Sequence, residues 1–418
     1  MDDSTYRVYP YRWAVLGSFM LVNLVMQALW IDYSPIMGDA AAYYGVSRFA
    51  IGFLAMLFMI IFLPLSIPAS WAIDRFGFRK ATGFGAILMA VFALARALAG
   101  PSFALALIGT VGLALAQPLL MNAWTKVAAH WFAEKERATA VGLVTLSNLL
   151  GIAAGMLASP ALLAAFSMGA TQYAYAAAAL AAALAYAFVA REYPPTPAGP
   201  GGTDEKALML DGLKHALSVP SFRLFLGVVF VGMGLFNGLT TWIDEIVGPR
   251  GFGPARAGDL GALLLVGGLF GAVALPALSD RTGVRKPWML VGLLGSLPGL
   301  AGMAFAHSFG ALAASAFVLG FFLTSVMPVG MQFATEVTRP TPEGTSNGLV
   351  QLCGQLSVVF VLLMQAMKGV SGEFTWSLVA SGAFVVAAAL LVPFMREARA
   401  GGSPGPEAEP GRSLPETD

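Results

Sequence analysis

Three acidic residues stand close to tryptophan in otherwise apolar segments. Asp32 follows Trp30 by two positions, and the pair Asp244-Glu245 follows Trp242. A carboxylate beside an indole face can attract an organic cation through charge and a cation–π contact. A carboxylate that loses its water can instead serve as a proton-coupling site. We therefore predict that Asp32, Asp244 and Glu245 bind a cation or couple to protons. The alternative is that they lie in water at the ends of their segments, beside anchoring tryptophans.

Polar side chains also recur at helical spacing in the apolar segments. A polar group inside a membrane is costly unless it faces a partner or a water-filled cavity, so polar residues on one helical face mark such a cavity. The alternative is hydrogen bonding between helices without any ligand. Because three segments carry such stripes, we favour a substrate path. The predicted substrate-binding residues are Asn23, Gln27, Trp30, Asn148, Asn237, Thr241, Trp242, Gln351 and Gln355.

A charged heptad occurs twice, as DRFGFRK from Asp74 and as DRTGVRK from Asp280, 206 residues apart. The glycine permits a tight turn, and the carboxylate can lie near the free N–H groups of a helix start. One copy alone is typical of a basic loop at the inner membrane face. Two copies indicate an internal duplication, and Gly142-Leu143 and Gly348-Leu349 repeat the offset. The predicted gating residues are Asp74, Arg75, Gly77, Arg79, Asp280, Arg281, Gly283 and Arg285.

Composition and segment length place these residues in a membrane protein. Hydrophobic residues make up 57% of the chain and charged residues 11%, against about 25% charged in soluble domains. A spanning helix needs about 20 mostly apolar residues. We predict an all-α membrane protein with twelve transmembrane helices near 13–37, 49–73, 81–99, 103–128, 139–160, 171–190, 221–246, 258–278, 287–306, 309–334, 345–369 and 374–396.

The polar segments divide the chain into two halves. Residues 191–220 are rich in proline, glycine and charge, and we predict a cytoplasmic linker between six-helix bundles at 1–190 and 221–396. Residues 397–418 are predicted to form a disordered cytoplasmic tail. Most of the 24 Lys and Arg residues fall on the side of the termini. Both termini are therefore expected in the cytoplasm, in a plasma membrane or a bacterial inner membrane.

One buried-or-exposed arginine and three pairs of glycines bear on helix packing. Arg96, late in the third helix, is expected to reach the outer surface or to meet a buried partner. The glycine pairs Gly151/Gly155, Gly234/Gly238 and Gly267/Gly271 are expected to allow close helix packing.

Other kinds of chemistry find little support in the sequence. The net charge of +1 argues against a nucleic-acid partner, and the single Cys353 excludes a disulfide framework. His130, His215 and His307 lack metal-ligand spacing, and no phosphate-binding Gly-Lys-Ser/Thr motif is present. We expect no enzymatic activity, metal or cofactor. The expected partners are the lipid bilayer, a small-molecule substrate and, in one alternative, a coupling proton, for a monomeric protein.

The heptads resemble the signature loop of the major facilitator superfamily, G-x-x-x-D-R/K-x-G-R/K-R/K, with Ser70 in place of the leading glycine. The resemblance covers the whole membrane region. It implies the major facilitator fold of two pseudo-symmetric six-helix bundles. It also implies that each loop aspartate latches onto the other half in the outward-open state, Asp74 near the start of helix 11 and Asp280 near the start of helix 5.

Three stretches resemble the feline leukaemia virus subgroup C receptor group, solute carrier family 49: YRWAVLGSFMLVNLVMQALWIDYSPI, KVAAHWFAEKERATAVGLVTLSNLLG and ATEVTRPTPEGTSNGLVQLCGQ. The resemblance implies transport of choline, ethanolamine, haem or related metabolites. Trp30 and Gln355 fall on positions that contact choline in that group. The sequence departs from the group at two positions. It has Leu149 where the group has a glutamine, and Asn237 where the group has an aromatic residue.

We therefore predict a secondary active or facilitative transporter of a small organic metabolite, with a choline-like organic cation as the favoured substrate, working by alternating access. One alternative is a proton-coupled carrier of another metabolite, such as an organic acid, a vitamin or haem. A receptor or sensor with a transporter fold is the other.

Overall fold

The computed structural model describes residues 7–198, 210–341, 343–368 and 373–397, and the tail predicted at 397–418 lies outside them except for Glu397. Within the described residues every regular element is helical, and twelve helical segments are long and apolar enough to cross a membrane. The prediction of an all-α membrane protein with twelve spanning helices is therefore confirmed.

Six spans make up the first half of the chain. Two of them are interrupted: in the first span, Pro35 lies in a short turn after Asp32 and Tyr33, and in the fourth, Asn122 and Ala123 separate two helices. The elements in order are α1 (Arg12–Ile31), η2 (Ser34–Ile36) and α2 (Met37–Tyr44); α3 (Arg48–Phe76); α4 (Phe78–Leu98); α5 (Phe103–Met121) and α6 (Trp124–Trp131); α7 (Glu134–Ala165); and α8 (Met168–Val189).

The short helix α9 (Leu210–Ser218) leads into the six spans of the second half. The fifth of these spans is interrupted at Ser357. The elements in order are α10 (Pro220–Val247) and η3 (Gly248–Arg250); α11 (Pro254–Thr282); α12 (Lys286–Phe305); α13 (Phe309–Val337); α14 (Glu343–Leu356) and α15 (Val358–Ala366); and α16 (Thr375–Leu391) and η4 (Val392–Phe394).

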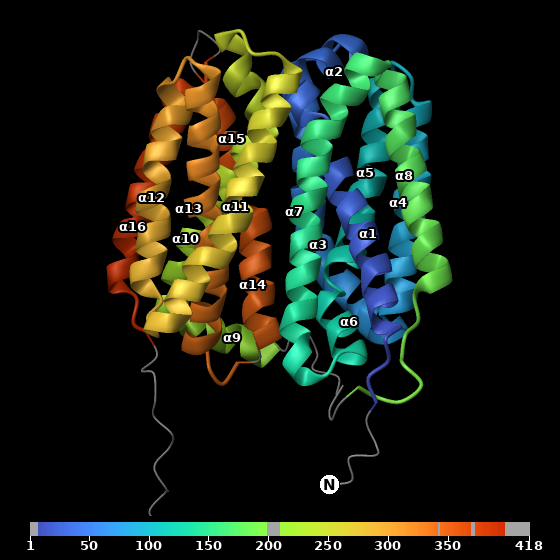
Figure 1. Cartoon of the computed structure of the whole chain (residues 1–418), viewed down its shortest axis with the longest axis vertical. Coiled ribbons are helices and arrows are strands. Elements are labelled where there is room, and N and C mark those ends of the chain that lie inside the picture. The colour runs from blue at the N-terminus through green and yellow to red at the C-terminus, as the bar shows by residue number, and fades with distance from the viewer. Residues whose placement is uncertain (1–6, 199–209, 342, 369–372, 398–418) are drawn as a thin grey trace, which may run out of the picture.

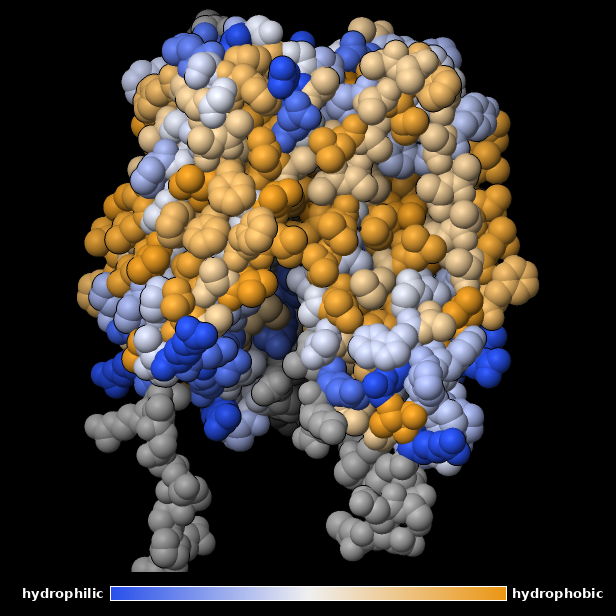
Figure 2. Space-filling model, in the orientation of Figure 1, coloured by the Kyte–Doolittle hydropathy of each residue, from blue (hydrophilic) through white to orange (hydrophobic). Residues whose placement is uncertain are grey.

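The two halves lie side by side, with α7 and α11 adjacent at the front of Figure 1. The first and last described residues lie at the same end of the molecule, which we call the terminal end; α2 lies at the opposite end. Hydrophobic side chains form a belt around the middle of the surface, and hydrophilic side chains gather at both ends (Figure 2). This distribution matches a protein whose sides face lipid and whose ends face water.

The predicted close packing at the glycine pairs is confirmed. On α7, a Cβ atom at Gly151 would fall on the carbonyl oxygen of Leu24, and one at Gly155 would meet the backbone of Ala28. Gly267 and Gly271 likewise lie against backbone carbonyl groups of α13, whereas Gly234 and Gly238 make room for the Phe360 and Met364 side chains of α15. These contacts let the helix backbones approach closely and fix the positions of the residues between them.

Candidate functional site

The two halves meet at the opposite end through α2 and α10. The backbone N–H of Gly38 on α2 donates to Asp244 Oδ2 on α10 at 2.9 Å. Gly38 and Asp244 are 206 residues apart, the offset that separates the two heptads. The hydrogen bond thus joins equivalent positions of the duplicated halves, which places it close to the axis that relates them.

An aromatic contact seals the same end. The indole N–H of Trp242 donates to the carbonyl oxygen of Val361 at 3.2 Å, and its ring stacks on Phe49 of α3, with the ring planes 14° apart. A Cβ atom at Gly52 of α3 would overlap the Trp242 ring. Trp242, predicted as a substrate-binding residue, is fully buried in this contact between the halves.

The terminal end has a different shape. A hollow separates the two halves there and opens toward the terminal end, with hydrophilic side chains at its back (Figure 2). The structure therefore describes a conformation that is closed at the opposite end and hollowed from the terminal end.

The predicted polar residues of the first half gather around Gln27. The Gln27 amide nitrogen donates to Met121 Sδ of α5 at 3.9 Å, and the Gln27 Cβ lies where α1 packs on Gly151 of α7. Asn148 lies three residues before Gly151, and Gln117 lies four residues before Met121, so both are within about one helical turn of a Gln27 neighbour. The side-chain oxygens of Asn23, Gln27, Gln117 and Asn148, and that of Gln172 beside Asp32, accept no hydrogen bond within the described structure.

Trp30 lies one turn from Gln27 on α1. Its indole N–H donates to the carbonyl oxygen of Ala55 on α3 at 3.1 Å, which fixes the plane of the ring. The side chain is 8% exposed, so the ring is enclosed by protein.

The predicted residues of the second half lie on α10 and around the break in the eleventh span. The Asn237 amide donates to Ser357 Oγ at 3.2 Å, and Ser357 is the residue between α14 and α15. Thr241 is buried one turn further along α10, while Gln351 and Gln355 on α14 are partly exposed. A break in a spanning helix is a common feature of transporter binding sites, because it frees backbone groups near the substrate.

All three predicted acidic residues are buried and already have partners. Asp32 pairs with Arg96 of α4 and also accepts from the Gln172 amide at 3.4 Å; Asp32 and Arg96 are each 1% exposed. Glu245 pairs with Lys368 at 2.7 Å. The alternative that Asp32 and Glu245 lie in water at the ends of their helices is therefore wrong. Of the two expectations for Arg96, the buried partner is the one that the structure has.

Both heptads form ion pairs within their own half in this conformation. Asp74 Oδ1 lies 2.6 Å from Lys126 Nζ at the end of the fourth span. Asp280 pairs with Arg285, which also lies 3.1 Å from Glu336 of α13. The cross-half latches predicted for an outward-open state stay predictions, since this conformation is hollowed from the terminal end. Arg75 and Arg281 are exposed, and Gly77 and Gly283 have positive φ angles of 86° and 69°.

The helix that follows each heptad is capped by a glutamate from the end of the same half. Glu192 accepts from the N–H groups of Phe78 and Arg79 at 3.0 and 2.7 Å. Glu397 accepts from the N–H groups of Arg285 and Lys286 at 2.8 and 2.6 Å. Each carboxylate satisfies N–H groups that a helix start leaves free, and it interacts favourably with the helix dipole.

Glu192→Gln is expected to lower the free energy of unfolding by roughly 1–2 kcal/mol, because a neutral amide accepts these N–H groups less strongly than a carboxylate. Hydrogen exchange should speed up in the first turn of α4. Glu397→Gln is the matched variant and should have the same effect on the first turn of α12 alone. Unchanged exchange at both helix starts would contradict the capping role.

Sequence reasoning missed Glu192, Glu397, Gln117 and Ser357. The two glutamates had a signal, because an Arg-Glu pair ends each half at positions 191–192 and 396–397. Gln117 is the one amide of its helix and forms no stripe, and Ser357 is small enough to pass as a packing residue. Among the described residues, no group of three His, Cys, Asp or Glu side chains could hold a metal ion.

The chain belongs to the major facilitator superfamily: the model of that family matches residues 15–278 and 245–417. The fold agrees with solved structures. A bacterial homologue of the human lysosomal transporter Spinster, in an inward-facing and unoccupied conformation, superposes with a TM-score of 0.77 at 18% identity, over 93% of this chain and 98% of that one. The human organic anion transporter MFSD10 gives a TM-score of 0.68 at 16% identity, over 92% and 100%.

Within the superfamily, the chain belongs to the group of solute carrier family 49. Solute carrier family 49 member A3 of Danio rerio is 30% identical over 380 residues, which is 87% of this chain and 80% of the relative. The choline/ethanolamine transporter FLVCR2 of Homo sapiens is 28% identical over 384 residues, covering 86% and 73%. The protein is therefore a multi-pass membrane transporter of a small organic molecule.

Proposed function

We propose that this protein carries a choline-like organic cation across the membrane by alternating access. Relatives that transport choline and ethanolamine match it over most of its length. The observation that carries the proposal is the enclosed Trp30 ring, fixed through Ala55, one helical turn from the unpaired amide oxygen of Gln27. An aromatic face attracts a quaternary ammonium, and an amide oxygen can accept the hydroxyl proton of choline.

Neutral groups perform this recognition. Asp32 and Glu245 are neutralised by Arg96 and Lys368, and Asp244 is held by the Gly38 N–H. The groups that remain available to bind a cation are the Trp30 ring and the amide oxygens. Such a site holds its ligand less tightly than a site with a free carboxylate, which suits a carrier that must release its substrate on the other side.

In the proposed cycle, the Gly38–Asp244 and Phe49–Trp242 contacts close the outer gate while the hollow faces the cytoplasm. The excess of Lys and Arg on the side of the termini favours a cytoplasmic location for both termini. When the halves rock, these contacts separate and the heptad loops close the terminal end.

Proton coupling through Asp244 is the second candidate, because among the described residues this carboxylate forms no ion pair, unlike Asp32 and Glu245, and it lies in the gate itself. A protonated Asp244 would accept the Gly38 N–H less strongly and would favour opening. The charged groups that face it include Arg48, Asp39 and Glu245.

The test is uptake of labelled choline into proteoliposomes, with and without an imposed pH gradient. Trp30→Ala is expected to reduce uptake at subsaturating choline by roughly thirtyfold, the equivalent of about 2 kcal/mol for a desolvated cation–π contact. Trp376→Ala is the matched control, because this tryptophan is 72% exposed on the lipid-facing surface, and it should leave uptake unchanged.

Asp244→Asn separates the two candidates. Loss of the gradient dependence with uptake retained would assign proton coupling to this residue. Absence of choline uptake by the wild type under every gradient would overturn the cation proposal and leave the transporter family intact.

A further inference from the structure

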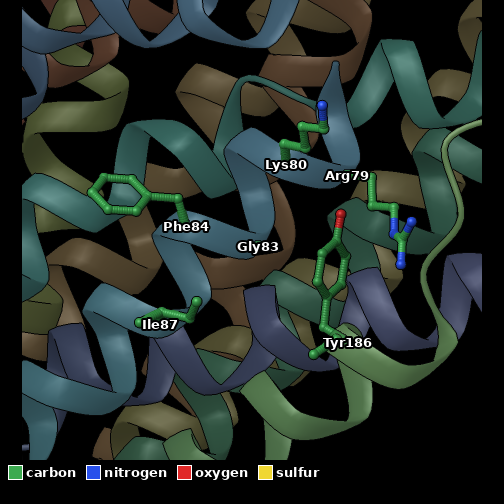
Figure 3. A pocket seen from close by; sticks show the side chains of 7 residues that line it. Arg79, Lys80, Gly83, Phe84, Ile87 and Tyr186 are labelled. Atoms are coloured by element: carbon green, nitrogen blue, oxygen red, sulfur yellow. The ribbon is translucent and has the colours of Figure 1, made fainter. Parts of the chain in front are cut away.

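A groove on the lipid-facing side of the first half combines two cations with an apolar floor. It lies between α4 and α8, close to the terminal end, and has a volume of about 340 Å³. Figure 3 shows Arg79 and Lys80 at one end, Tyr186 beside Gly83, and Ile87 further along α4. Its lining residues are Arg79, Lys80, Gly83, Phe84, Ile87, Tyr186 and Ala187.

The two cations are free to receive an anion. Both Arg79 and Lys80 are exposed, and within the described residues neither side chain forms an ion pair or a hydrogen bond. The nearby carboxylate, Glu192, is engaged by the backbone N–H groups of Phe78 and Arg79. Two cations against this one carboxylate leave the groove with a net positive charge.

The floor continues as an apolar path along the helices. Phe84 and Ile87 are 57% and 58% exposed, and Val91, Leu94 and Leu98 extend the same face of α4. On α8, Leu180, Leu184 and Phe188 are also exposed. The groove thus offers charge at the level of the headgroups and hydrocarbon contact below them.

The second half provides an internal comparison, because the equivalent positions there are filled. Arg285, the equivalent of Arg79, pairs with Asp280 and Glu336, and Lys286 donates to the carbonyl oxygen of Pro393 at 2.9 Å. Met289 takes the place of Gly83 and is fully buried. In the second half, protein groups thus bind both basic side chains of the heptad. In the first half, the two basic side chains lie at an open groove.

We propose that this groove binds an anionic phospholipid of the leaflet at the terminal end, with the phosphate at Arg79 and Lys80 and an acyl chain along Gly83, Phe84 and Ile87. Basic pockets between membrane helices are suited to anionic headgroups. Gly83 is required because its missing side chain opens the groove: a Cβ there would have only Tyr186 near it, at 3.8 Å, and a longer side chain would project into the lipid position. The site is independent of the transported substrate.

Native mass spectrometry of the full-length protein, titrated with phosphatidylglycerol and separately with phosphatidylcholine, tests the proposal. The wild type should retain phosphatidylglycerol in preference to phosphatidylcholine. The double variant R79Q/K80Q should weaken phosphatidylglycerol binding roughly thirtyfold, the effect of about 1 kcal/mol for each cation near a lipid headgroup. Gly83→Leu should weaken it as well, although both charges remain.

Arg281→Gln is the matched control, since it removes an exposed cation from the second heptad, and it should leave binding unchanged. Thermal unfolding of each variant verifies that it is folded. Equal retention of the two lipids by the wild type would overturn the proposal. It would also be overturned if Arg281→Gln reduced binding as much as R79Q/K80Q, or if Gly83→Leu had no effect.

Discussion

Arg96→Met is expected to lower the free energy of unfolding by about 3–5 kcal/mol, because it leaves the Asp32 carboxylate buried without its counter-charge. The guanidinium also lies 4.9 Å above the ring of Tyr33, a contact that methionine replaces only in part. The measurement is the thermal unfolding midpoint of the purified protein in detergent.

The double variant D32N/R96M distinguishes loss of a partner from loss of packing. It removes both charges, and a buried ion pair replaced by neutral groups often costs little. We therefore expect the double variant to regain most of the stability lost in Arg96→Met. Arg256→Met is the exposed control, because the Arg256–Asp259 pair has side chains 55% and 45% exposed and should contribute less than about 1 kcal/mol.

The same pair bears on the coupling role predicted for Asp32. If D32N/R96M is stable and still transports with the gradient dependence of the wild type, the pair is structural and coupling belongs elsewhere. A stable double variant that transports without any gradient dependence would support coupling through Asp32.

The architecture was predictable because it depends on composition over long windows. Twelve apolar runs and a repeated heptad survive small errors in boundaries, so the helix number and the duplication could be read directly. The breaks at Asp32–Tyr33 and Ser357 were not predicted, because the hydropathy of a 20-residue window hardly changes when one or two residues leave the helix.

The sequence indicated which buried polar residues to expect, but hardly ever which groups they contact. Asn23 and Gln27, singled out by the stripe on the first span, are buried, and their role in substrate binding stays a prediction. The roles of Asp32 and Trp242 depend on what faces them from distant segments: Arg96 is 64 residues from Asp32, and the ring of Trp242 packs on Phe49. Helical periodicity gives the direction of a side chain within one helix and carries no information about the neighbouring helix.

Gly52→Leu is expected to reduce the transport rate 100-fold or more while leaving the protein folded. This corresponds to destabilising the closed outer gate by about 3 kcal/mol. In the closed outer gate the Gly52 backbone lies against the Trp242 ring, so any side chain at this position overlaps the indole. Trp242 cannot move aside easily, because its N–H is held by Val361 and its other face packs near Phe374, 6.0 Å between ring centroids. The variant should therefore favour the conformation in which the outer gate is open.

Accessibility of the site gives a readout that does not require the substrate to be known. In a Cys353→Ser background, a cysteine placed at Gln27 should react with a membrane-impermeant thiol reagent applied from outside more rapidly when Gly52→Leu is also present. Gly17→Leu is the matched control, because a Cβ atom at Gly17 meets nothing within 4 Å and this position is exposed, and it should change neither transport nor labelling. If Gly52→Leu transports normally, then α3 and Trp242 do not need to touch during the cycle, and the gate must close through other contacts between the halves, among them the Gly38–Asp244 hydrogen bond.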